Sequence, residues 1–61
     1  MKNEIELIQE VITDLTVHIE HALGVLDKTK NHLIKDHIEK MEDQLRILEG
    51  EVNYLRRVKG A

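Results

Sequence analysis

Two runs of apolar residues with heptad spacing dominate the pattern of this chain. The first begins at Ile5 and ends at Leu26, and the second begins at Ile34 and ends at Leu55. Within each run the apolar positions are separated alternately by three and four residues, the a and d spacing of helices that pack against each other. The pattern therefore predicts two long helices with one apolar seam between them. The seam residues are Ile5, Ile8, Ile12, Leu15, Ile19, Ala22 and Leu26, with Ile34, Ile38, Met41, Leu45, Leu48, Val52 and Leu55.

Residues typical of helix boundaries flank both runs. The segment 27–32 between the runs is polar throughout and contains Asn31, a preferred capping residue. Asn3 and Glu6 have the spacing of a capping box before the first run. Gly60 follows the second run, at the place where a glycine commonly ends a helix.

The two helices are predicted to fold back on each other as an antiparallel hairpin, an all-α fold. When the chain is folded at residue 30, every apolar position of one run faces an apolar position of the other. One continuous helix is the alternative, and it would place Lys30 at a position where the heptad pattern requires an apolar residue. In the hairpin, a single domain over residues 1–61 contains a helix at about 4–27, a turn at about 28–31 and a helix at about 32–58.

A second, partly apolar stripe occupies the g and c heptad positions beside the seam. In an antiparallel pair the g positions of both helices flank the same side of the seam, so the two stripes share one face of the hairpin. Asp14, Lys40 and Glu51 also fall in these stripes. We call this side the partner face, and its expected interface residues are Leu7, Val11, His18, His21, Val25, Leu33, His37, Gln44, Ile47, Tyr54 and Val58.

The partner face predicts association with another protein chain. A core within one chain of this length rarely supplies more than about 3–5 kcal/mol, and the 61 residues include no cysteine for disulfides. The simplest partner is a second copy, which would give a homodimeric four-helix bundle. Association with a different protein is one alternative. Isolated surface apolar residues, which are common in small proteins, are another.

Composition argues against several other classes of protein. A formal net charge of −3 and a single aromatic residue, Tyr54, disfavour nucleic-acid binding, which uses clustered basic and stacking side chains. No apolar run approaches the roughly 20 residues of a membrane span. The first residues lack the apolar stretch of a signal peptide. A cytoplasmic protein is therefore expected.

Four histidines raise the question of a metal site. His18 and His21 are neighbours on one helix, and His37 falls on the same face from the other helix. Imidazole ligands suit zinc, but the sequence has no HExxH motif, and we predict that these histidines form the polar middle of the partner face. A pH-sensitive interface is a further possibility, because protonated histidines brought together across a two-fold axis repel one another.

The sequence predicts an interaction module without enzymatic activity. It contains no Ser/His/Asp set or phosphate-binding glycine loop, so no catalytic residue, cofactor or small-molecule substrate is expected. A homodimeric regulator, inhibitor or assembly factor that binds a protein partner is the leading hypothesis. Small proteins of this kind are frequent among bacterial and phage regulators.

Two other functions remain open at this level. Dimeric helical hairpins can bind folded RNA through one helical face, as the plasmid copy-number regulator Rop does. This chain is similar to Rop in length and predicted architecture alone, with no matching motif residues. It carries two small basic groups, one near the turn with Lys28, Lys30 and Lys35, and one at the open end with Lys2, Arg56, Arg57 and Lys59. The other possibility is a structural component of a larger helical assembly, in which a different chain would cover the partner face.

Gly24 and Gly50 both fall at f positions, the outermost points of the two helices. A glycine inside a helix costs about 1 kcal/mol relative to alanine. Either the two glycines are tolerated there, or another backbone approaches closely on that side.

Overall fold

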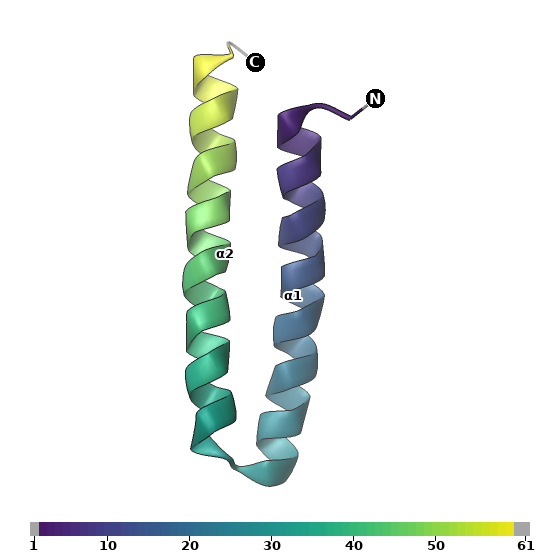
Figure 1. Ribbon diagram of the computed structural model, residues 1–61, viewed down its shortest axis with the longest axis vertical. Coiled ribbons are helices and arrows are strands. Elements are labelled where there is room, and N and C mark those ends of the chain that lie inside the picture. Colours follow the sequence, from purple (N-terminus) through teal and green to yellow (C-terminus); the bar gives the residue numbers. More distant parts are fainter. Residues whose placement is uncertain (1, 60–61) are drawn as a thin grey trace.

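The computed structural model describes residues 2–59 and shows two long helices joined by a short connection (Figure 1). Helix α1 is Glu4–Thr29 and helix α2 is His32–Val58. They run antiparallel and pack against each other, so the predicted hairpin is confirmed and the single continuous helix is wrong. Neither helix of the described residues is long and apolar enough to cross a membrane.

Polar side-chain caps begin both helices. The side-chain oxygen of Asn3 accepts a hydrogen bond of 2.9 Å from the backbone N–H of Glu6 at the start of α1. The side-chain oxygen of Asn31 likewise accepts from the backbone N–H of Leu33 at 2.9 Å and begins α2. Lys59 ends α2, and the expected capping role of Gly60 lies outside the described residues.

Helix α1 ends two residues later than the sequence indicates. It continues through Thr29 and stops at Lys30, which has left-handed backbone angles of φ 56° and ψ 25°. The backbone N–H of Lys30 donates to the carbonyl oxygen of Leu26 at 2.7 Å, which closes the last turn. A non-glycine residue in this conformation gives no strong sequence signal, because glycine is the usual residue there.

The seam forms the core of the hairpin. All fourteen seam side chains are buried or half-buried. Ile19, Ala22, Ile38 and Met41 make up a buried cluster in the half of the hairpin nearer the turn. The four half-buried seam residues Leu15, Leu26, Ile34 and Leu45 pack against that cluster.

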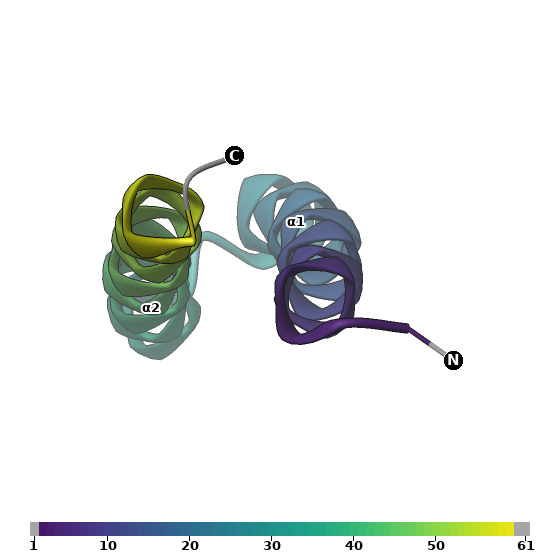
Figure 2. The same cartoon turned by 90° about the horizontal axis from the view of Figure 1, so that it is seen from above.

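The core is one layer thick. Seen along the helices, the two ribbons lie side by side, and no further element of residues 2–59 covers either broad side (Figure 2). Even Ile38, the most buried core residue, keeps 4% of its surface exposed. Within one chain, the seam is therefore bordered by solvent on both sides.

We expect alanine at either glycine to stabilise the hairpin. A Cβ atom built at Gly24 or Gly50 meets no heavy atom within 4 Å. Gly24→Ala and Gly50→Ala should each raise the free energy of unfolding by about 0.5–1 kcal/mol, because alanine loses less backbone entropy in a helix. Urea unfolding followed by circular dichroism measures this change. A loss of stability would instead mean that another chain packs closely against that side.

Candidate partner interface

The expected interface residues lie on the surface of the hairpin. Ten of the eleven are exposed, and Val25 is half-buried. Six of them are large apolar side chains whose exposed fractions run from 51% at Val11 to 66% at Leu33. These six side chains are Leu7, Val11, Leu33, Ile47, Tyr54 and Val58.

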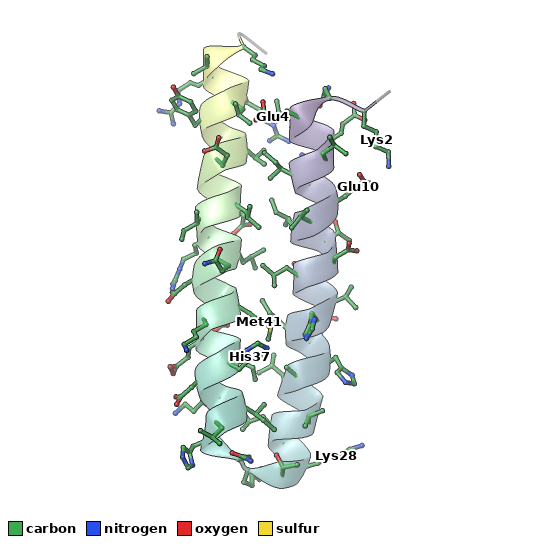
Figure 3. The ribbon with its side chains drawn as sticks, viewed as in Figure 1. Lys2, Glu4, Glu10, Lys28, His37 and Met41 are labelled. Carbon is green, nitrogen blue, oxygen red and sulfur yellow. The ribbon has the colours of Figure 1, made fainter. Side chains whose placement is uncertain are left out.

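A contact between two histidines shows that both helices contribute to the same side. The ring centroids of His18 in α1 and His37 in α2 are 6.2 Å apart, with the ring planes inclined at 70°. Each histidine directly precedes a buried seam residue, Ile19 or Ile38. Figure 3 shows His37 near Met41, on the side of α2 that faces α1. The g-position stripes therefore flank the seam together, as the heptad pattern predicts.

The opposite broad side of the hairpin is more polar. A shallow groove runs between the helices there, with the seam residues Ile12 and Val52 among its lining. The remaining lining residues are polar: Gln9, Thr13, Glu49, Asn53 and Arg56. Among residues 2–59, the large exposed apolar side chains outside the partner face are Val17 and Leu23, both on α1. The two broad sides thus differ in the number of apolar side chains that they expose.

The partner face extends beyond the eleven residues first expected. Glu4 precedes Leu7 by three positions, and Lys28 follows Val25 by three, so both continue the α1 side of the face at its ends. Both side chains are exposed. Glu4 also forms an ion pair with Lys59, at 3.6 Å, that links the two helices at the open end. The alternating spacing was a sufficient signal for these two positions, but the predicted α1 stripe ended at Leu7 and Val25, one step short at each end.

The histidines do not assemble into a larger ligand set. Across residues 2–59, no group of three or more histidine, aspartate or glutamate side chains is placed to hold a metal ion. The structure brings His18 and His37 together, whereas His21 does not complete a three-ligand group with them. No polar or charged side chain in the described part of the chain is buried. The histidines are thus part of an exposed surface.

Several of the basic side chains are paired with carboxylates. Near the turn, Lys30 lies 3.3 Å from Asp27. At the open end, Lys59 pairs with Glu4, and Lys2 pairs with Glu10. These exposed pairs contribute little stability, but they reduce the positive potential of both basic groups. The arrangement therefore gives no added support to nucleic-acid binding.

Comparison with protein-family models, curated proteins and solved structures found no match for this chain. The features of this chain that bear on function are the shape, exposure and charge pattern of the partner face.

Proposed function

We propose that this protein is a non-enzymatic interaction module that pairs with a second copy through the partner face. Two hairpins stacked in this way form a four-helix bundle. The dimer acts as a small regulator, inhibitor or assembly factor by binding another protein. The observation that carries the proposal is the set of six large apolar side chains exposed along one side of the hairpin.

The dimensions of the hairpin suit a stable interface. Its long and intermediate extents are 45 and 20 Å, and its thickness is 11 Å. The broad side therefore has an area comparable with the roughly 800 Å² that each partner contributes to a standard interface. Covering it would also shield one edge of the single-layer seam from water, which adds hydrophobic stabilisation of about 25 cal/mol for each Å² of apolar surface removed.

The apolar side chains on α2 have the spacing of a binding helix. Ile47, Tyr54 and Val58 are separated by seven and four residues and have exposed fractions of 60–63%. Helices that bind apolar surfaces place their anchoring side chains at such intervals. Tyr54 also offers a large ring with a polar tip, a combination enriched at protein interfaces.

Sedimentation equilibrium over a roughly hundredfold concentration range tests the proposal, together with thermal unfolding at the same concentrations. We expect a particle of twice the 7.1 kDa chain mass, with a melting temperature that rises with concentration because dimerisation is linked to folding. A helical monomer at every concentration would contradict the homodimer. Binding to added RNA or DNA that weakens steeply with salt would favour the nucleic-acid alternative.

A further inference from the structure

We infer that the two hairpins of this dimer pack end for end, with the turn of one copy beside the open end of the other. The inference rests on the proposed homodimer and adds its orientation. Two-fold symmetry allows two ways of stacking the partner faces. In the end-for-end arrangement, α1 lies on α1 of the second copy and α2 lies on α2. In the alternative, both turns lie at the same end and α1 lies on α2 of the second copy.

In an end-for-end dimer, the partner-face residues of α1 meet the same residues of the second copy in reverse order. Most of the resulting pairs are chemically complementary. In sequence they are Glu4, Leu7, Val11, Asp14, His18, His21, Val25 and Lys28, which we call the α1 row. Figure 3 shows Glu4 and Lys28 at opposite ends of the helix. Reversal pairs Glu4 with Lys28, Leu7 with Val25, Val11 with His21, and Asp14 with His18. These pairs combine opposite charges, two apolar groups, or a carboxylate with an imidazole, and Val11 with His21 is the one mixed pair.

The partner-face residues of α2 also form mostly complementary pairs when they meet the same residues of the second copy in reverse order. The α2 row is Leu33, His37, Lys40, Gln44, Ile47, Glu51, Tyr54 and Val58. Reversal pairs Leu33 with Val58, His37 with Tyr54, Lys40 with Glu51, and Gln44 with Ile47. The lysine thus meets a glutamate, and the two apolar ends meet each other. Gln44 with Ile47 is the one pair that joins an amide to an apolar side chain.

The alternative orientation opposes charged and apolar side chains. Placing the α1 row on the α2 row at equal height puts Glu4 on Val58, Val11 on Glu51, Asp14 on Ile47, and Lys28 on Leu33. It also puts His21 beside Lys40, and Leu7 on Tyr54 is its one good apolar pair. A charged group covered by apolar side chains loses hydration without gaining a partner, which is unfavourable.

Acidic and basic side chains are segregated along the partner face, and this segregation favours the end-for-end orientation. Within the two rows, the exposed acids Glu4, Asp14 and Glu51 lie toward the open end, where Glu4 also pairs with Lys59 of its own chain, whereas Lys28 and Lys40 lie toward the turn. Only the end-for-end dimer brings these two halves together. It also places His18 opposite Asp14 of the second copy, so an imidazole meets a carboxylate.

Disulfide cross-linking tests the orientation directly, because the chain has no cysteine of its own. Glu4→Cys and Lys28→Cys chains are mixed, annealed and oxidised. We expect a disulfide between the two variants and little linkage within either variant alone, since identical positions lie about 36 Å apart along an end-for-end dimer. A mixture of Lys28→Cys with Leu33→Cys serves as the matched control. Linkage in that mixture instead would overturn the orientation.

A charge-reversal cycle provides a second readout by sedimentation equilibrium. Lys40→Glu and Glu51→Lys should each weaken the dimer by roughly three- to tenfold, because each change creates two like-charged pairs per dimer. The double variant should recover most of the affinity. A dimer that the double variant fails to restore would overturn the orientation while leaving the homodimer standing. A wild-type chain that is monomeric at every concentration would overturn both.

Discussion

Replacing Ile38 with alanine is expected to lower the free energy of unfolding by about 2–5 kcal/mol. Ile38 is the most buried residue of the core, with 4% of its surface exposed, and it belongs to the cluster with Ile19, Ala22 and Met41. The substitution removes apolar contacts and leaves a cavity that two helices can only partly close. A core of this size rarely contributes more than about 3–5 kcal/mol, so the substitution should remove a large part of the stability of the hairpin. Urea unfolding followed by circular dichroism measures the loss.

Val17→Ala is the control for this substitution. Val17 is 60% exposed, and it precedes buried Ile19 by two positions, roughly 200° around the helix. Its truncation should leave the stability unchanged or slightly higher, because alanine has the greater helix propensity. If Ile38→Ala and Val17→Ala had the same small effect, packing along the seam would not be the main source of the hairpin's stability.

The two helices and their seam were predictable from the sequence because each seam position obeys the same spacing. Seven apolar residues in each run leave a single helical face for burial, and the antiparallel match from Leu26 with Ile34 to Ile5 with Leu55 is apolar throughout. The polar caps were also predictable from the sequence, because Asn3 and Asn31 accept the backbone hydrogen bonds expected of residues at helix N-termini.

The end of α1 was less predictable. The hairpin turns through Lys30 in a left-handed conformation, a role that a glycine would have marked. Sequence spacing alone could not separate the last helical residue from the first turn residue, because residues 27–32 are all polar. Their hydrogen bonds decide the boundary: the Thr29 hydroxyl donates to the Val25 carbonyl oxygen within α1 and accepts from the Asn31 N–H.

The sequence predicted which residues share the partner face. The structure shows in addition how exposed their side chains are. Heptad spacing placed His18 and His37 on one side, and their rings are in edge-to-face contact. Whether another chain covers this face depends on contacts between chains. Dimerisation through this face is a prediction that solution experiments test.

Replacing Ile47 with aspartate is expected to weaken the proposed dimer by at least about 100-fold, or about 2.7 kcal/mol. Ile47 is 63% exposed in the hairpin, so the change should be tolerated in a monomer. In the dimer it would bury a carboxylate against Gln44 and position 47 of the second copy, where loss of hydration is costly. Ile47 also lies near the middle of the α2 row, so the two introduced charges of an end-for-end dimer come close together and repel each other.

Val17→Asp separates this interface effect from a general effect of aspartate in a helix. Val17 has a similar exposed fraction, 60%, but lies on the outward side of α1. Both substitutions introduce the same poor helix former at an exposed β-branched position, so they should reduce helix stability by similar amounts. Sedimentation equilibrium should show a monomer for Ile47→Asp and a dimer for Val17→Asp. If Ile47→Asp remained as dimeric as the control, the partner face would not be the surface through which two copies associate, and a different protein would be its expected occupant.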